Sequence, residues 1–152
     1  MKITLIYPDF PFWRAEVARI SLFIGSVDFE DLRITREEFQ KVKETGLLDN
    51  GIVIPFHQLP CLQVDGVSIA QTGGIARFCG KISGLYPLND NILSARVDQF
   101  IDFATDITVL ISSAGKVESE NEKRINRQKL YEGDLSKKLK ILEKNLKENS
   151  DL

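Results

Sequence analysis

Residues 58–77 constrain the fold of this chain more than any other stretch. They contain a proline, a short apolar run, the pair Asp65-Gly66, a second apolar run and the polar pair Gln71-Thr72. An Asp-Gly pair between two apolar runs predicts a β-hairpin, because glycine accepts a positive φ angle without a steric penalty. The bond Leu59-Pro60, directly before the first run, is a candidate cis peptide, since an X-Pro bond adopts cis at a cost of only about 0.5–1 kcal/mol.

The pair Gln71-Thr72 lies where a helix is expected to begin. A threonine hydroxyl and the unpaired N–H groups of a first helical turn favour an anion. Together with the hairpin before it, this pair predicts a small docking edge for a peptide-like molecule that carries a carboxylate.

Apolar spacing and capping residues predict the order β-α-β-α-β-β-α for the first part of the chain. Thr35 and Glu38 fit a capping box, so a helix is expected from there to Thr45, ended by Gly46. The other expected elements are a strand over Lys2–Ile6, a helix over Phe12–Ile24 with Val17, Ile20, Phe23 and Ile24 at helical spacing, a strand over Val27–Ile34 and a helix over Thr72–Lys81. This order is that of an α/β thioredoxin-like domain with a mixed four-stranded sheet.

The pattern becomes all-helical after Pro87. A long helix is expected over Ile92–Ala114, and a second amphipathic helix carries Leu135, Leu139, Leu142 and Leu146 on one face. We therefore expect a thioredoxin-like domain over residues 1–84, a linker over 85–91 and a partial all-helical domain of two long helices over 92–152. The leucine face of the second helix needs a cover.

Composition excludes several classes of function. The formal net charge is -2, which gives no reason to expect nucleic acid, and the sequence has no apolar run long enough for a membrane span. The two cysteines, Cys61 and Cys79, form no metal-binding motif and are expected to be buried. The beginning of the chain does not resemble a signal peptide, so a cytoplasmic location is expected.

The motifs of this chain resemble those of the glutathione transferases, in their sigma-like, tyrosine-type branch. The resemblance rests on Gln-Leu-Pro-Cys-Leu-Gln-Val-Asp-Gly over 58–66, the pair Gln71-Thr72, and Ile-Ala-Arg-Phe over 75–78. It extends to Leu-Ile-Tyr over 5–7, Arg-Ala-Glu over 14–16 and Gly-Leu-Tyr-Pro over 84–87. Family members usually continue through further helices, so the resemblance implies an apparently truncated second domain. We favour truncation for the missing part and dimerisation as the cover of the leucine face.

The resemblance implies that Tyr7 is the catalytic residue. A phenol that donates a hydrogen bond to the sulfur of glutathione favours the thiolate, which is the nucleophile. The glutathione-binding set that the resemblance implies is Arg14, Phe39, Lys43, Gln58, Leu59, Pro60, Gln71, Thr72 and Asp106.

Each member of this set has a role implied by the family. Lys43 would pair with the glycyl carboxylate, Gln58 would contact the glycyl end, and the Leu59 backbone would pair with the cysteinyl amide and carbonyl. Gln71-Thr72 would hold the γ-glutamyl carboxylate. Asp106 of a second copy would reach the γ-glutamyl amine, which implies a homodimer.

Simpler interpretations of these residues stay open at this point. Tyr7 could be a core tyrosine, Lys43 a solvated surface lysine and Asp106 an exposed helix carboxylate. In addition, Phe39 stands where the family has a tryptophan, so one donor to the glycyl carboxylate is lost.

Two loops depart from the family pattern. The loop after Tyr7, residues 8–13, is longer by one residue and carries Phe10, Phe12 and Trp13, which form an aromatic rim or pack the first helix. The connection 44–57 is also longer than usual and is expected to form the lip of the site, where it could close over a ligand or block it.

The function that the resemblance implies is a glutathione transferase, a detoxification enzyme in which Tyr7 activates the thiolate for attack on a small electrophile. Glutathione is the co-substrate and no metal is required. The alternative is a non-catalytic glutathione-binding or protein-interaction module of the same fold. The absence of further helices, which in the family form most of the electrophile pocket, supports that alternative and would reduce the activity of an enzyme. A third, weaker interpretation is an incomplete and marginally folded chain.

Overall fold

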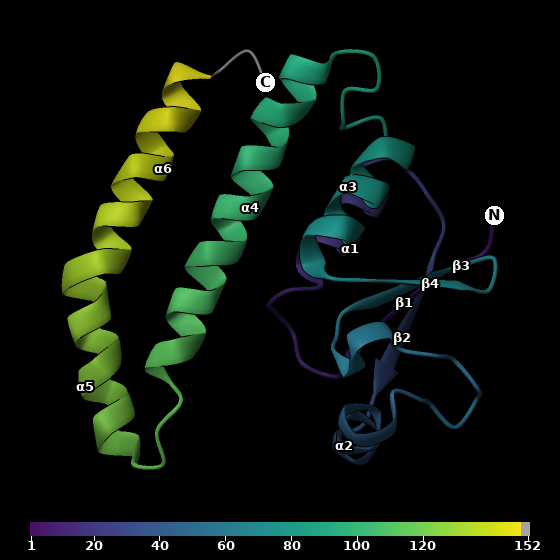
Figure 1. Cartoon of the computed structure of the whole chain (residues 1–152), viewed down its shortest axis with the longest axis horizontal. Helices are drawn as coiled ribbons and strands as arrows, with labels where there is room; N and C mark the ends of the chain where they lie inside the picture. The colour runs from purple at the N-terminus through teal and green to yellow at the C-terminus, as the bar shows by residue number, and fades with distance from the viewer. Residues whose placement is uncertain (150–152) are drawn as a thin grey trace. The chain divides into compact units, whose positions relative to one another are not determined.

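The computed structural model describes residues 1–149 of the chain. It divides into two compact units, Met1–Ser94 and a second that begins at Ala95. Each unit is described by itself. Figure 1 labels the helices and strands of both units.

The first unit follows the predicted β-α-β-α-β-β-α order. Its strands are β1 (Ile3–Pro8), β2 (Glu30–Ile34), β3 (Cys61–Val64) and β4 (Val67–Ala70). Its helices are α1 (Glu16–Ile24), α2 (Arg36–Thr45), the short 3-10 turn η1 (Pro55–His57) and α3 (Thr72–Ile82). The expected thioredoxin-like domain is confirmed.

The four strands form one mixed sheet in the order β2-β1-β3-β4. Strand β1 runs parallel to β2, with Tyr7 opposite Arg33, and antiparallel to β3. Strands β3 and β4 form the predicted hairpin, and its turn residues Asp65 and Gly66 both have positive φ angles, 47° and 86°.

Two apolar cores lie on the two faces of this sheet. The first joins β1 and β3 to helices α1 and α3, which pack against each other; its buried members include Leu5, Tyr7, Ala18, Leu22, Leu62, Ile75 and Cys79. The second joins the sheet to α2 and the connection after it, through Ile6, Ile34, Val42, Leu48, Ile54 and Cys61. The long connection 46–57 therefore supplies core residues as well as a loop.

Local signals predicted the boundaries of α2 correctly. The Thr35 hydroxyl accepts a hydrogen bond from the Glu38 backbone N–H at 3.2 Å, and the Glu38 carboxylate accepts one from the Thr35 N–H at 2.7 Å. Gly46 ends the helix with φ 70°. The bond Leu59-Pro60 is cis, as the sequence suggested.

The expected start of the first helix was wrong. Helix α1 begins at Glu16 rather than Phe12, because the preceding residues form turns and Trp13 has φ 127°, which no helix accepts. The start of the second strand also differs, since β2 begins at Glu30 rather than Val27.

The stripe used to predict α1 does not face the core. Val17, Ile20, Phe23 and Ile24 are all exposed, and Phe23 is 82% exposed. The buried face consists of Ala18, Ser21 and Leu22. Just after this helix, a Cβ on Gly25 would lie 2.5 Å from Ser83 Cβ, so the glycine allows a close approach to the end of α3.

The second unit is an antiparallel helical hairpin (Figure 1). Helix α4 (Asn91–Ala114) starts in the first unit and is followed by α5 (Glu120–Leu130), the π-helical turn η2 (Tyr131–Leu135) and α6 (Ser136–Glu148). Arg96 on α4 donates to the Asn149 side-chain oxygen at 2.6 and 3.1 Å, which joins the two ends of the hairpin.

The predicted leucine face is covered only in part by this hairpin. Leu135 and Leu142 are half-buried, whereas Leu139 and Leu146 are exposed. In the part of the chain that the structure describes, none of the helices has the length and apolar character needed to cross a membrane.

Candidate glutathione site

Tyr7 lies near the end of β1 with little exposure to solvent. Its side chain is 4% exposed, and the hydroxyl accepts a hydrogen bond from the backbone N–H of Arg14. The ring of Phe10 packs against the Tyr7 ring with a centroid distance of 5.1 Å and an angle of 54°. The loop after β1 therefore folds back over the tyrosine that it follows.

The electrostatic surroundings keep Tyr7 protonated. Burial raises the pKa of Tyr7, and the hydrogen bond from the Arg14 backbone and the charges of Arg14 and Arg19 offset this only in part. The Arg19 guanidinium carbon lies 5.8 Å from the centre of the Tyr7 ring. A tyrosine is neutral at pH 7 even at its ordinary pKa of about 10, so Tyr7 has a proton to donate.

A polar edge is formed by the residues before β3 and after β4. Gln58 and Gln71 are exposed, and the Gln71 amide donates to the Gln58 side-chain oxygen at 3.5 Å. Leu59, the residue after Gln58, is half-buried. Within residues 1–149, its backbone N–H and carbonyl form no hydrogen bond with another backbone group. Pro60 is buried. The Leu59 backbone is therefore open to an extended peptide-like ligand.

Helix α3 begins at this same edge. Gln71 precedes it with φ 70°, a conformation that few residues other than glycine adopt, and its side chain makes no capping hydrogen bond. Thr72 is the first residue of the helix. The first-turn N–H groups of α3 are thus available to an anion, and a strained residue directly before a binding edge is typical of functional sites.

Lys43 and Phe39 lie one turn apart on α2. The Lys43 ammonium sits 4.5 Å from the centre of the Phe39 ring and donates to the Gln40 side-chain oxygen at 3.2 Å. Lys43 is exposed. Phe39 therefore holds the lysine by a cation–π contact, whereas the family's tryptophan would supply an N–H donor.

The chain was compared with known proteins. No family model matches it. Glutathione S-transferase 2 of Caenorhabditis elegans is 37% identical over 91 residues, 58% of this chain and 44% of that protein. Glutathione S-transferase 1 of Ascaris suum is 32% identical over 133 residues, 85% of this chain and 60% of that protein. The solved structure of prostaglandin synthase D of Nilaparvata lugens has a TM-score of 0.82 at 28% identity, over 98% of this chain and 70% of that chain.

The chain belongs to the glutathione S-transferase family. It spans about half the length of the curated relatives that it matches. Within this glutathione S-transferase chain, the residues expected to bind glutathione form three local groups. These are Tyr7 with Arg14, Phe39 with Lys43, and the edge made by Gln58, Leu59, Pro60, Gln71 and Thr72.

The connection 46–57 is anchored in the core of the glutathione S-transferase fold. Leu47 and Val53 form an antiparallel bridge, and the Ile54 N–H donates to the Gly46 carbonyl at 2.7 Å. Leu48 and Ile54 are buried in the second core. This connection is therefore a small folded hairpin beside α2.

His57 ends that hairpin and contacts the end of α2. Its Nδ1 lies 3.2 Å from the carbonyl oxygen of Lys43. A Cβ on Gly46 would meet the His57 ring at 2.7 Å. The contacts of this histidine are therefore structural.

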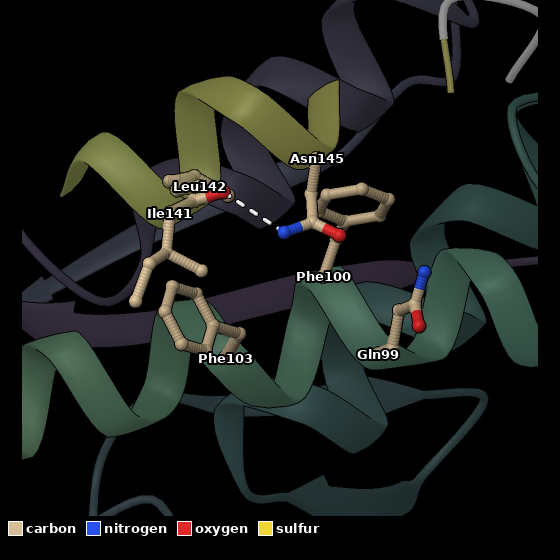
Figure 2. A pocket seen from close by; sticks show the side chains of 6 residues that line it. All are labelled: Gln99, Phe100, Phe103, Ile141, Leu142 and Asn145. Atoms are coloured by element: carbon tan, nitrogen blue, oxygen red, sulfur yellow. Dashed lines mark hydrogen bonds between the residues drawn. The ribbon is translucent and has the colours of Figure 1, made fainter. Parts of the chain in front are cut away.

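Asp106 lies on α4 in the second unit and is exposed. This unit has its own cavity of about 150 Å³ between α4 and α6. Figure 2 shows its lining, in which the Asn145 amide donates to the Ile141 carbonyl; the residues are Gln99, Phe100, Phe103, Ile141, Leu142 and Asn145. None of the expected glutathione-binding residues belongs to this cavity.

Both cysteines of the chain are buried. Cys61 and Cys79 are buried free thiols, and burial raises the pKa of each to about 11. Across residues 1–149, no cluster of three or more histidine, cysteine, aspartate or glutamate side chains is arranged to hold a metal ion.

The sequence interpretation missed Arg19, whose charge acts on Tyr7. Arg19 follows Glu16 by three residues on α1, so the two side chains share a face and form an ion pair. That spacing was the available signal. It gave no indication that the pair lies against the tyrosine, because this depends on the packing of α1 on the sheet.

Proposed function

We propose that this chain binds glutathione along the edge made by Gln58, Leu59, Gln71 and Thr72, and that Tyr7 stabilises the thiolate for attack on a small electrophile. The observation that carries the proposal is the position of Tyr7 at the end of β1, with its ring against Phe10 at 5.1 Å and its hydroxyl bonded to the Arg14 backbone N–H. A tyrosine of ordinary pKa, about 10, keeps at neutral pH the proton that it would donate to sulfur.

The magnitude of this effect is sufficient. A free thiol has a pKa of about 8.5, so it is mostly protonated at pH 7. A hydrogen bond to a charged group is worth about 1.5–3 kcal/mol, and one pKa unit corresponds to about 1.4 kcal/mol. One phenol donor therefore lowers the thiol pKa by roughly one to two units, and no general base is needed.

The binding edge fits the chemistry of the tripeptide. The Leu59 N–H and carbonyl can pair with the cysteinyl amide, as in a short strand addition. The start of α3 at Thr72 suits the γ-glutamyl carboxylate, and Lys43 suits the glycyl carboxylate. By analogy with the family, Asp106 of a second copy contacts the γ-glutamyl amine in a homodimer.

The test is Tyr7→Phe, which removes the donor and keeps the ring. With glutathione and a generic aryl halide, we expect the rate at pH 7 to fall by about eightfold to twenty-five-fold, which is the loss of thiolate when the thiol pKa returns from about 7.5 or 6.5 to about 8.5. Glutathione affinity should be nearly unchanged. Tyr131→Phe is the matched control, because Tyr131 is an exposed residue of η2. An unchanged rate in Tyr7→Phe would refute the assigned role.

A second candidate function is a non-catalytic glutathione-binding module. The observation that favours it is the cover over Tyr7, whose side chain is 4% exposed beneath the Phe10 ring. Retention on immobilised glutathione without turnover of any aryl halide would support the module. Because one structural relative is a prostaglandin synthase, glutathione-dependent isomerisation should be assayed beside conjugation.

A further inference from the structure

A network of charged side chains lies on the sheet beside Tyr7. Residues two apart on a strand point to the same face, so Asp31 and Arg33 of β2 share one. The parallel register places Asp31 opposite Leu5 and Arg33 opposite Tyr7 of β1. Leu5 and Tyr7 belong to the core under α1. The two charged residues therefore lie on the α1 side of the sheet.

The contacts of these residues form a continuous path. Arg19 on α1 donates to the Asp31 carboxylate from Nε at 3.1 Å and from a terminal nitrogen at 3.0 Å. Arg33 donates from Nε at 2.7 Å to Asp31 Oδ2, the same oxygen that accepts from Arg19 Nε. The terminal nitrogen of Arg33 then donates to the backbone carbonyl of Phe10 at 3.0 Å. Asp31 thus fixes the guanidinium that holds the loop.

This loop, residues 9–13, depends on the end of β2 for its position. The Asp9 N–H donates to the Ile34 carbonyl at 3.2 Å, and the Asp9 carboxylate lies 4.0 Å from the Arg33 guanidinium. Beyond Phe10 the loop turns through Trp13, whose φ is 127°. The side chain that reaches the loop backbone from the sheet is Arg33.

The hydrogen bond from Arg33 fixes Phe10, whose ring packs against Tyr7. Phe10 packs on the Tyr7 ring at 5.1 Å, and Phe12 contacts Trp13 in an edge arrangement at 5.9 Å. The carbonyl that Arg33 holds belongs to Phe10 itself. A fixed backbone at Phe10 therefore sets both the cover of Tyr7 and the start of the aromatic rim.

We propose that Arg33 is a positioning residue that holds the aromatic loop over Tyr7 and so sets the wall on which an electrophile would lie. Its effect on the reaction rests on the proposed function. Its effect on the loop does not, because removal of the guanidinium takes away the hydrogen bond to the Phe10 carbonyl and so loosens the loop beyond Asp9, with or without a ligand.

The experiment uses the full chain and the variant Arg33→Met, which keeps the aliphatic stem and removes the guanidinium. Trp13 is the only tryptophan of the sequence and lies in the loop, so acrylamide quenching of its fluorescence reports on the loop directly. We expect the quenching constant to rise by about twofold, as for a locally loosened segment. Arg36→Met is the matched control, since Arg36 is exposed in the first turn of α2.

The kinetic arm separates the two substrates. Arg33→Met should raise the KM for an aryl halide by several-fold and leave the KM for glutathione unchanged. Arg33→Lys keeps the charge but cannot bond Asp31 and Phe10 at the same time as a guanidinium does. Its KM for the aryl halide should lie between those of the wild type and Arg33→Met. A general loss of folding would instead raise the KM for both substrates, the Trp13 quenching constant and the sensitivity to urea. In that case Arg33→Lys decides whether Arg33 positions the loop.

Each outcome has one meaning. Unchanged Trp13 quenching in Arg33→Met overturns the inference. Raised quenching with an unchanged electrophile KM overturns the assignment to the electrophile wall. If the unmodified chain shows no turnover, the catalytic function fails, and the quenching result alone decides whether Arg33 holds the loop.

Discussion

The long connection after α2 should contribute to stability as a core segment does. Ile54 is 1% exposed and packs with Ile6, Val42 and Cys61 in the second core. Ile54→Ala removes three carbon atoms, which at about 0.8 kcal/mol each amounts to about 2.4 kcal/mol of transfer free energy. The cavity left behind adds to this, so the free energy of unfolding should fall by about 3–4 kcal/mol, within the usual range for such changes.

Urea denaturation followed by circular dichroism measures this loss. With an m value of about 2 kcal/mol per molar, the urea midpoint should fall by roughly 1.5–2 M. Val53→Ala is the control, because Val53 is the neighbouring residue and is 56% exposed. Its cost should stay below about 0.5 kcal/mol. Equal, small losses for both variants would refute the conclusion that the connection is anchored in the core.

Three further predictions follow from individual contacts. Gly25→Ala should lower the melting temperature at a cost of about 1–3 kcal/mol, since the new Cβ would lie 2.5 Å from Ser83 Cβ. Cys61 and Cys79 should not react with a disulfide reagent at pH 8 until urea unfolds the chain, because burial raises the pKa of both thiols to about 11. Burial opposes ionisation of Asp31, but hydrogen bonds from two arginines outweigh it and lower its pKa. Its contribution to stability is therefore complete above the unfolded-state pKa of about 3.9 and is lost as the pH falls through the lower folded-state value. Asp31→Asn should have a lower urea midpoint than the wild type at pH 7, and the difference should shrink as the pH falls below about 3.9.

Local sequence signals predicted those parts of the fold that depend on local interactions. The capping box of Thr35, the stop at Gly46 and the hairpin turn at Asp65-Gly66 involve residues within four positions of one another, and all are confirmed. The order of strands and helices followed from these signals.

Features that depend on packing could not be predicted in the same way. The apolar stripe of α1, with Phe23 as its most exposed member, pointed to the wrong face, because the buried face of α1 is decided by its packing against the sheet and α3 and not by apolar spacing alone. The burial of Leu48 and Ile54, which anchor the connection 44–57 in the second core, was likewise not predicted from the sequence.

The candidate site shows the same division. Its residue types were predicted by a resemblance in local motifs, and the structure brings Gln58 and Gln71 within hydrogen-bond distance. The charged path from Arg19 through Asp31 was missed, since it joins residues from different elements with no local motif.

Glutathione binding at the start of α3 is the central claim, and titration calorimetry with the full chain tests it most directly. We predict saturable binding that Thr72→Val weakens by about tenfold, which corresponds to the roughly 1.4 kcal/mol of one hydrogen bond to a carboxylate. Thr108→Val is the control, because the Thr108 hydroxyl bonds to the Ala104 carbonyl of its own helix at 2.8 Å. Absence of binding to the unmodified chain, or equal affinities of the two variants, would contradict the account.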